Sequence, residues 1–458
     1  MSTHGGDVNR RHVLGAAGAG AAALTLVPSW VLGEKRTGAA PPSERLNVAS
    51  VGAGGRAGSD INGVARHGGN IIALCDIDPK RGGGNFKRFP KAKKYVDFRK
   101  MLDEMDKQID AVIVGTPDHT HAVACMNAIK RGKHVYCEKP LTHSVGEVRK
   151  LRKAAIEHKV ITQVGNQGHA SEHMRLVKEW IADGAIGNVT EVHLGCDAFR
   201  NVYCQINKLP ELKKTFQVPA HVNWDLWLGP VRHHDYKPFY HPWNWRGWTH
   251  FGTGTIGDWI CHVLDPTFWA LDLDLPTSVQ AETEGYDPVK HEPCYPPAAK
   301  ITWEFPAKGK RKAVKVTWFD GKFRIPRPKM MESKRRPPGV GGIILGDNGL
   351  AIKHGSHGAG GARIIPEEAM KAYKLPPKTL PRTNKGHHWD WIDAIRNTRP
   401  AGSSFEYGGA MTEVGLLGMI AIRMGGKKLE YDARNMRFTN SPEANKFLDP
   451  PYRAGWTL

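Results

Sequence analysis

The sequence predicts an α/β protein with two domains: a doubly wound parallel sheet, then an α+β domain built on a large, mostly antiparallel open sheet. Between residues 46 and 165, short apolar runs alternate with helical patterns, which is typical of parallel strands joined by helices. In 166–458 the apolar runs lengthen and alternate with polar residues, as strands do when one face is solvated. The chain has 458 residues, which is too long for one ordinary domain.

The elements of both domains follow from where the apolar runs stop at Gly, Pro or Asp. In the first domain we expect strands at 46–51, 70–75, 111–115, 134–137 and 160–164, and helices at 56–67, 97–105, 119–131 and 144–158. In the second we expect strands at 189–195, 277–284, 298–305, 313–319 and 428–431, and helices at 171–183, 387–397 and 406–424. The basic, Pro-rich stretch 324–342 predicts an exposed loop.

The first residues are typical of an export signal. Arg10 and Arg11 precede an apolar, Ala- and Gly-rich run from Val13 to Val27. We expect residues 1–33 to be a twin-arginine signal peptide and 34–45 a linker, and we expect the mature protein to be periplasmic or otherwise extracytoplasmic. An Ala-rich N-terminal helix is the alternative. The apolar run is too short for a stable membrane span.

The composition is strongly basic. Lys and Arg number 65 against 45 Asp and Glu, a formal net charge of +20. The basic clusters do not alternate with aromatics in a nucleic-acid-binding module, so no nucleic-acid partner is expected. The charge fits a basic soluble enzyme, or one with an anionic substrate or surroundings. The 7 Cys residues contain no C-x-x-C pair, so neither disulfides nor a metal site are expected.

The stretch 45–58 carries the clearest ligand-binding pattern. A short apolar run stops at Gly52, and Gly54 and Ala57 complete the spacing G-x-G-x-x-A. Gly52 permits a tight turn, Gly54 lets a pyrophosphate approach the backbone, and Ala57 lets the helix pack close to the strand. The helix then directs its first N–H groups at the phosphates. The pattern predicts a dinucleotide-binding Rossmann turn.

Asp76 stands where this fold has the acid that binds the adenosine ribose. It ends the apolar run 71–75 and lies 24 residues after Gly52. This acid favours NAD, whereas Lys80 and Arg81 are close enough to accommodate a 2′-phosphate, so NADP stays open. The alternative is an ordinary βαβ turn with a solvated Asp.

Two further blocks follow strands of the predicted parallel sheet, at the edge where such sheets bind ligands. The first is the run 115–121, in which Asp118 or Thr120 can equally cap the next helix. The second is Cys137-Glu138-Lys139-Pro140-Leu141. The proline restricts the backbone at Lys139, so the ammonium can point into a cleft and hydrogen-bond a substrate hydroxyl. An isolated E-K-P triplet is more often a plain turn.

The segment 252–265 predicts a general base. If 257–271 is helical, Asp258 and His262 are i and i+4 on one face, and Asp265 lies one turn further on. Pairing with Asp orients an imidazole and raises its basicity, which suits a base that takes a hydroxyl proton. A capping Asp and a core His are the alternative.

The segment 223–250 is rich in Trp, His and Pro. Indole faces can stack on the C–H faces of sugar rings, and Arg246, His241 and Asn244 can donate to hydroxyls. Packed core or interface is the usual role of Trp. The candidate substrate-binding residues are Trp245, Arg246, Asp258 and His262.

Together these blocks resemble the glucose–fructose oxidoreductase/inositol dehydrogenase (Gfo/Idh/MocA) family over roughly residues 45–430. The motifs, in order, are V-G-A-G-G-R-A, C-D-I-D, T-P-D-H-T-H, C-E-K-P and G-D-W-I-C-H-V-L-D. The resemblance implies that Lys139, Asp258 and His262 are catalytic. Two positions depart from the family, since Ile260 stands where Gly is common and Asp118 where many members have Asn. W-D-L-W-L-G-P and H-P-W-N-W-R-G-W are similar to the family's exported branch.

The resemblance implies an NAD(P)-dependent oxidoreductase that transfers hydride between a hydroxyl of a sugar, sugar derivative or cyclitol and nicotinamide. Because free cofactor is not expected outside the cytoplasm, an exported enzyme would hold it tightly. The alternatives are an NAD-dependent glycoside hydrolase, acting by transient oxidation and elimination, and a non-catalytic sugar-binding module. We expect a homo-oligomer, dimer or tetramer. The expected cofactor-binding residues are Gly52, Gly54, Gly55, Arg56, Ala57, Asp76, Thr116, Pro117, His121, Glu138 and Lys139.

Overall fold

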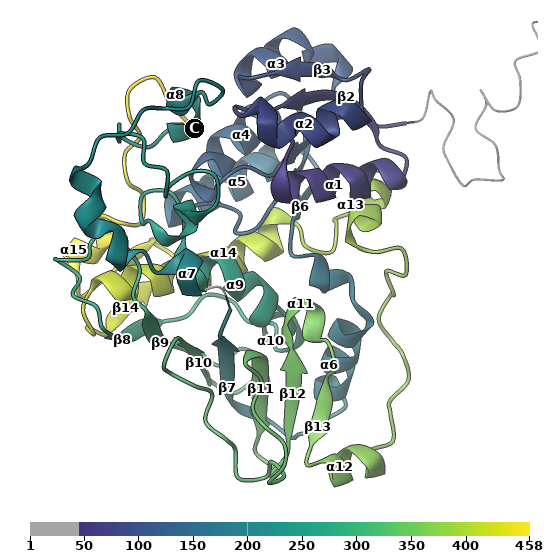
Figure 1. Cartoon of the computed structure of the whole chain (residues 1–458). Helices are drawn as coiled ribbons and strands as arrows, with labels where there is room; N and C mark the ends of the chain where they lie inside the picture. The colour runs from purple at the N-terminus through teal and green to yellow at the C-terminus, as the bar shows by residue number, and fades with distance from the viewer. Residues whose placement is uncertain (1–44, 199) are drawn as a thin grey trace, which may run out of the picture. The chain divides into compact units, whose positions relative to one another are not determined.

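The computed structural model describes residues 45–198 and 200–458 (Figure 1). The expected signal peptide, residues 1–33, lies outside the described residues. Residues Leu46–Leu458 form one unit. Its first part is a six-stranded parallel sheet in the order β3-β2-β1-β4-β5-β6. The strands are β1 (Asn47–Val51), β2 (Asn70–Cys75), β3 (Lys93–Tyr95), β4 (Ala111–Val114), β5 (His134–Cys137) and β6 (Thr162–Val164).

Helices cover both faces of this sheet, which confirms the doubly wound fold. One face packs against α3 (Phe98–Glu104), α4 (Asp118–Ile129) and α5 (Val145–Glu157). The other packs against α1 (Gly55–Arg66) and against α13 (His387–Arg396), a helix far later in the chain. Strand order reverses between β1 and β4, and such a reversal is where doubly wound sheets bind ligands.

Two elements of the first domain were not predicted. They are α2 (Pro79–Arg88) and β3. The helix α2 contains Gly82, Gly83 and Gly84, which are poor helix formers, but Asp78 caps it with its side chain and Pro79 occupies the first turn. The strand β3 is a short basic edge strand without the apolar run that predicts a strand.

The second domain is built on a nine-stranded sheet in the order β13-β12-β11-β7-β10-β9-β8-β14-β15. Only β7 and β10 pair in parallel among its described strands, so the predicted mostly antiparallel sheet is confirmed. The strands are β7 (Val189–Cys196), β8 (Ser278–Glu284), β9 (Ala298–Phe305), β10 (Val314–Asp320), β11 (Val340–Gly346), β12 (Ala351–Gly355), β13 (Arg363–Ile365), β14 (Leu429–Asp432) and β15 (Arg437–Phe438).

Helices pack on this sheet around the buried Trp303 and Trp318. The longest, α14 (Phe405–Arg423), packs against α9 (Gly254–Val263). A Cβ at Gly415 would lie 2.7 Å from Cγ2 of Ile260, so glycine allows the two helices their close approach. The remaining helices are α6 (Glu172–Ala182), α7 (Arg200–Tyr203), α8 (Trp224–Leu228), α10 (Asp265–Ala270), α11 (Ser356–Ala359), α12 (Glu367–Ala372) and α15 (Pro442–Asn445), with 3-10 turns η2 (Asp106–Gln108), η3 (Gln167–Ala170), η4 (Ile206–Lys213) and η5 (Asn244–Gly247).

Two predictions for the second domain need correction. The expected helix 257–271 is two helices, α9 and α10, divided at Leu264. Pro266 lies in the first turn of α10, where its missing N–H is tolerated, but it cannot continue α9. The predicted loop 324–342 ends at residue 339, because Val340 begins β11. Among the described residues no helix is both long and apolar enough to cross a membrane.

Candidate active site

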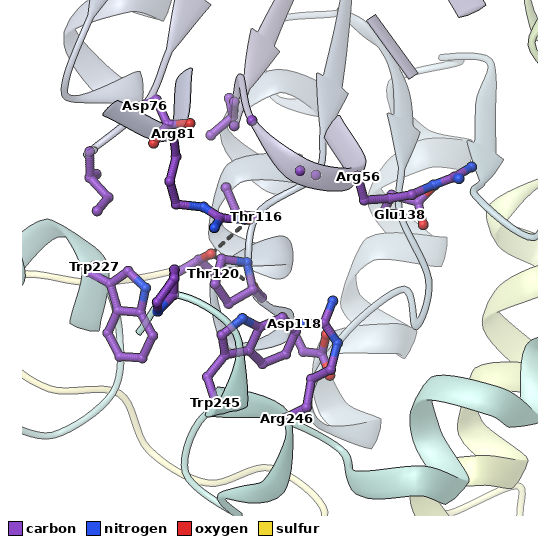
Figure 2. A pocket seen from close by; sticks show the side chains of 18 of the residues that line it. Arg56, Asp76, Arg81, Thr116, Asp118, Thr120, Glu138, Trp227, Trp245 and Arg246 are labelled. Carbon is purple, nitrogen blue, oxygen red and sulfur yellow. Dashed lines mark hydrogen bonds and ion pairs between the residues drawn. The ribbon is translucent and has the colours of Figure 1, made fainter. Parts of the chain in front are cut away.

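A cavity of about 640 Å³ lies at the C-terminal ends of the parallel strands (Figure 2). Gly52, Asp76, Gly115 and Glu138, which directly follow β1, β2, β4 and β5, line its first wall. The second domain lines the rest, with Tyr203, Trp245, Arg246, Asp258, His262 and His357. The cavity therefore joins the predicted cofactor residues to the predicted substrate residues.

Gly52 makes the sharp turn between β1 and α1. Its φ of 92° lies in the left-handed region that favours glycine. A Cβ at Gly52 would lie 2.9 Å from the main-chain oxygen of Gly115, so the backbone after β4 leaves no room for one. Ala57 is fully buried beneath the turn, and a Cβ at Gly115 would lie 2.6 Å from the Cβ of Ala57. Small residues at all three positions bring α1 against the sheet.

Gly54 is the N-cap of α1, and Gly54, Gly55 and Arg56 line the cavity. Among the described residues no side chain caps the first N–H groups of α1 and no acid lies in its first turn. These N–H groups are available to a pyrophosphate, and the residues present fit a bound dinucleotide. A Cβ at Gly54 would lie only 2.5 Å from the main-chain oxygen of Arg81. The glycine is therefore also required by the approach of α2, which the sequence did not reveal.

Asp76 is held in place by two main-chain hydrogen bonds. Oδ2 accepts from N of Ala53 at 2.9 Å, and Oδ1 accepts from N of Asp78 at 3.0 Å. Burial raises the pKa of this carboxyl. Arg81 extends into the cavity beside it (Figure 2). An acid at this position fits ribose hydroxyls, and the guanidinium fits a phosphate.

Lys139 and Asp258 meet across the cavity. Nζ of Lys139 donates to the main-chain oxygen of Asp258 at 3.0 Å and also contacts its carboxylate. Tyr203 donates to the other carboxylate oxygen, and Nε of Arg246 lies 3.5 Å from that oxygen. Burial opposes ionisation of Asp258, but Lys139 and Arg246 outweigh it and hold the pKa of this carboxyl well below its usual range. These contacts fix the position of Lys139 in the part of the cavity where the two domains meet.

His262 lies one turn beyond Asp258 on α9 and lines the cavity. Its ring stacks on that of His357, with centroids 4.1 Å apart and an interplanar angle of 26°. Burial and the charge of Lys139 hold the pKa of His262 well below 6.5. The ring is therefore neutral near pH 7, and a neutral imidazole can accept a proton.

The carboxylate of Asp258 does not bind His262, contrary to the expected Asp–His pair. Its oxygens contact Lys139, Tyr203 and Arg246, and no described group hydrogen-bonds to Nδ1 of His262. In this structure Asp258 positions Lys139 instead of the imidazole.

Asp265 does not continue the face of α9, because the helix ends before it. Its carboxylate accepts from His169 Nδ1 at 2.9 Å, from Asn166 Nδ2 at 3.0 Å and from the Tyr407 hydroxyl at 2.6 Å. This buried cluster joins the start of α10 to the segment after β6. Asp265 does not line the cavity described above.

His357 was not predicted from the sequence. It follows β12 in a left-handed conformation, with φ 51° and ψ 55°. The turn η3 packs tightly on it, since a Cβ at Gly168 would lie 2.2 Å from the carbonyl carbon of His357. Ser171 Oγ donates to the carbonyl of Gly358. Such strain in a non-glycine residue is characteristic of functional sites. The glycine-rich sequence H-G-S-H-G around it was the only available signal.

Asp118 and His121, both on α4, have different surroundings. Asp118 lines the cavity, and its Oδ2 accepts from N and Oγ1 of Thr253 at 3.2 and 2.8 Å. His121 does not line the cavity. Its ring nitrogens lie 2.8 Å from the carbonyl oxygens of Pro140 and Thr116. His121 therefore connects the loop that carries Thr116 to the loop that carries Lys139, without lining the cavity itself.

Glu138 and Arg56 form an ion pair at the opposite end of the cavity from Asp76 (Figure 2). Nε of Arg56 lies 3.1 Å from Oε1 of Glu138, and Gln167 donates to the same oxygen at 2.6 Å. Burial and nearby Asp60 raise the pKa of Glu138 to about 7. The pair ties the glycine turn to the loop that carries Lys139.

The aromatic segment contributes both core and cavity wall. Trp224 and Trp227 stack with centroids 4.5 Å apart, inside a separate hydrophobic cluster. Arg246 lies over both Trp243 and Trp245, at 4.4 and 4.2 Å from their ring centroids. Trp245 lines the cavity next to Arg246 (Figure 2). The part of the segment around Arg246 thus faces the space where a substrate would lie.

Comparison with protein families places this site in a known context. The model of the Gfo/Idh/MocA oxidoreductase family, NAD-binding Rossmann fold, matches residues 46–166. The model of the same family's C-terminal α/β domain matches residues 171–308. The chain therefore belongs to the Gfo/Idh/MocA family of oxidoreductases, and its first domain is an NAD-binding Rossmann domain.

Curated relatives align with only part of the chain. Inositol 2-dehydrogenase of Rubrobacter xylanophilus is 33% identical over 148 residues, which is 32% of this chain and 42% of the relative. Levoglucosan dehydrogenase of Pseudarthrobacter phenanthrenivorans is 28% identical over 132 residues, 29% of this chain and 32% of the relative. The aligned part thus spans less than half the length of these relatives.

Solved structures share the fold over most of the chain. An inositol dehydrogenase homologue from Azotobacter vinelandii, complexed with NADH and myo-inositol, has 16% identity and a TM-score of 0.54, covering 84% of this chain and 98% of that chain. A levoglucosan dehydrogenase in complex with NADH has 16% identity and a TM-score of 0.56, covering 85% and 100%. At this identity the likeness demonstrates a common fold.

Proposed function

We propose that the protein is an NAD(P)-dependent dehydrogenase acting on a hydroxyl of a sugar, sugar derivative or cyclitol. One observation carries the proposal. A single cavity joins Gly52, Gly54 and Asp76, which fit a dinucleotide, to Lys139 and His262, which fit a hydroxyl undergoing oxidation. When bound, the cofactor supplies the group that accepts the hydride from the substrate, or donates it in the reverse reaction. Curated relatives named inositol 2-dehydrogenase and levoglucosan dehydrogenase support this class of substrate.

The residues of the chain have separate roles in this proposal. Lys139 donates a hydrogen bond to the substrate oxygen, and Asp258 holds the ammonium in position through its carboxylate and main-chain oxygen. His262 is neutral and takes the hydroxyl proton as hydride leaves the carbon. In the reverse reaction it returns the proton to the carbonyl oxygen.

The substrate class follows from the chemistry of the second wall. Trp245 offers an aromatic face for the C–H face of a sugar or cyclitol ring, and Arg246 beside it offers N–H donors. Tyr203 and Asp118 add oxygens that can accept from hydroxyls. Such a mixture fits a ring with several hydroxyl groups.

The decisive experiment uses the protein as purified, with any cofactor it retains. A panel of sugars, cyclitols and aryl glycosides is added while the absorbance of reduced cofactor and of free aglycone is followed. A dehydrogenase reduces its cofactor, and a substrate deuterated at the oxidised carbon leaves deuterium on it. Aglycone release without net cofactor change would instead indicate the glycoside hydrolase alternative. A protein that binds no cofactor would refute both and leave a sugar-binding module.

We further propose that the protein is exported by the twin-arginine route with its cofactor already bound. Arg10 and Arg11 before the apolar run 13–27 support this, and the route carries folded proteins. Replacing both by Lys keeps the charge but removes the recognised pair, so the protein should accumulate in the cytoplasm with residues 1–33 attached. Undiminished export of the double variant would argue against the route.

We also propose that the nine-stranded sheet supports a homo-oligomer. Helices such as α14 pack on one face of this sheet. The opposite face is covered in part by a small cluster that includes Phe319, Ile325 and Met331, and it carries the exposed Gln280 and Glu282 of β8. A dimer or tetramer measured by light scattering would support the proposal, and a monomer at micromolar concentration would contradict it.

A further inference from the structure

The segment 449–458 returns from the second domain to the Rossmann domain. After α15 it runs, in yellow, beside α8 to the label C (Figure 1). No motif in the sequence drew attention to it, and the roles assigned above do not use it. Yet Trp456, within this segment, lines the same cavity as Gly54 and Asp76.

Several polar contacts fix this segment along its length. The carboxylate of Asp449 binds Nζ of Lys150 at 2.8 Å. The hydroxyl of Tyr452 donates to the buried Glu147 at 2.5 Å. Both partners lie on α5, so the first half of the segment is attached to the Rossmann domain.

Arg453 attaches the second half to the loop around α8. Its main-chain N donates to the oxygen of Pro230 at 3.0 Å, and its Nε donates to the oxygen of Gly229 at 2.6 Å. Its remaining nitrogens bind the side chain of Asp225 at 2.5 Å and the main-chain oxygen of Asp225 at 2.7 Å. Four hydrogen bonds from one residue define the path of the segment toward Trp456.

The indole of Trp456 is held against the start of α3. Its ring centroid lies 6.2 Å from that of Phe98, and the guanidinium carbon of Arg99 lies 4.6 Å from the ring. Val96, Asp97 and Phe98, directly after β3, line the cavity together with Trp456. Asp76 directly follows the neighbouring strand β2. Because an acid there would receive the adenosine ribose, the base of a bound dinucleotide would lie beyond Asp76, where Val96, Phe98 and Trp456 line the cavity.

The loop around α8 closes the same end of the cavity from another side. Leu226 and Trp227 line the cavity, and N of Asn223 donates to the oxygen of Ile77 at 3.2 Å. This loop is the one that Arg453 binds. The segment and the loop are therefore connected to each other as well as to the Rossmann domain.

We propose that Trp456 is a cofactor-binding residue that forms one wall of the adenine site, and that segment 449–458 is a strap across the adenosine half of the cleft. The inference rests on the proposed function, because that function supplies NAD(P) as the occupant. The strap must detach before the cofactor can leave, so it slows release. Such retention fits the export proposed above, since free cofactor is not expected outside the cytoplasm.

The test measures release of bound NADH. Protein is loaded with NADH and chased with excess NAD⁺ while the fluorescence of bound NADH is followed. Trp456→Ala should accelerate release on the order of 10- to 100-fold, the size of effect that loss of an aromatic ring beneath a nucleobase produces. Trp456→Phe should have a smaller effect, and Arg453→Ala, which detaches the strap, should also accelerate release. Thr457→Ala alters an exposed residue of the same segment and should release NADH at the wild-type rate.

Fragments of the cofactor locate the effect. By calorimetry, Trp456→Ala should weaken AMP and ADP-ribose but leave nicotinamide mononucleotide unchanged. Wild-type protein that binds no NADH would refute the proposed function itself. Wild-type binding combined with unchanged release from Trp456→Ala and Arg453→Ala would refute only the strap. If Trp456→Ala lowers the melting temperature strongly, the comparison rests on Trp456→Phe and Arg453→Ala, and release at the wild-type rate from both variants would overturn the proposal.

Discussion

Nζ of Lys139 lies 3.0 Å from the main-chain oxygen of Asp258 and also contacts its carboxylate, so these two residues join the Rossmann domain to α9 across the cavity. The side chains of both are mostly buried, with 16% and 10% exposed. Removing one partner of a buried ion pair costs more stability than removing one partner of a surface pair, because the other charge is left buried and unpaired. Both residues should therefore act as one unit.

Lys139→Ala should reduce turnover on the order of 10²–10⁴-fold, because the substrate oxygen loses its hydrogen-bond donor. Asp258→Asn should also reduce turnover, and the double variant should lose less than the product of the two effects. Steady-state kinetics on the substrate found by the panel measures all three. Lys153→Ala removes an exposed lysine on α5, with 77% of its side chain exposed, and should leave turnover unchanged. Multiplicative losses in the double variant would show that the residues act separately.

His262→Ala should cost a similar factor in turnover, on the order of 10²–10⁴-fold, if this ring is the general base. The affinity for NADH should not change, because the ring lies on the substrate side of the cavity. Full activity in the variant would transfer the role to Lys139.

The stack between His262 and His357 allows a second test of whether His262 is the general base. His357 is one of the charges that lower the pKa of His262, after burial and Lys139. His357→Ala admits water and removes that neighbour, so the pKa of His262 should rise. The acid limb of the pH profile of kcat/KM should then move to higher pH, whereas in the wild type it lies below pH 6.5. An acid limb at the same pH in both proteins would exclude His262 as the titrating base.

Gly54→Ala should abolish tight NADH binding while the fold survives. The new Cβ would lie 2.5 Å from the main-chain oxygen of Arg81, so either the glycine turn or α2 must move. Gly84→Ala is the matched control, since it lies in α2 with nothing within 4 Å of its added Cβ. That variant should keep its affinity and gain about 0.5–1 kcal/mol of stability from the better helix former. Equal NADH affinity in both variants would contradict the assigned turn.

Much of the fold was predictable because it rests on local patterns. The strand 134–137 and the helix 144–158 were predicted within a residue, since an apolar run or a capping box defines their ends. The three-glycine helix α2 and the sheet edge β11–β13 were missed. Their stability comes from neighbours that only the tertiary structure supplies, such as the pairing of β11 with β7.

The candidate site was predictable where a short sequence motif carries the residue. Gly52, Gly54, Asp76, Lys139 and His262 all line the predicted cleft. The partner of Asp258 was assigned by helical spacing, which places side chains on one face but does not say which neighbour binds them. Lys139, His357 and Trp456 reach the cavity from three segments far apart in the chain, and no spacing rule relates them.

Asp118 provides a test that depends on pH instead of activity. The side chain is almost fully buried, at 3% exposed, and burial together with the charge of Asp258 raises its pKa from 3.8 to about 7. Its folded pKa is thus above its unfolded value. The contribution of this carboxyl to stability is therefore fully present below about pH 4, and it is lost as the pH rises toward and through 7, where the buried carboxyl must ionise.

Asp118→Asn removes this cost, and its amide oxygen can still accept from Thr253. The free energy of unfolding of the variant, relative to wild type, should be near zero at pH 4 and should rise with pH, reaching on the order of a few kcal/mol at pH 8, because each pKa unit corresponds to about 1.4 kcal/mol. Denaturant titrations at several pH values measure it. Asp274→Asn, at an exposed carboxyl, should give no such slope. A variant whose stability stays parallel to wild type from pH 4 to pH 8 would mean that Asp118 is ionised throughout and is stabilised by Lys139 and Arg246.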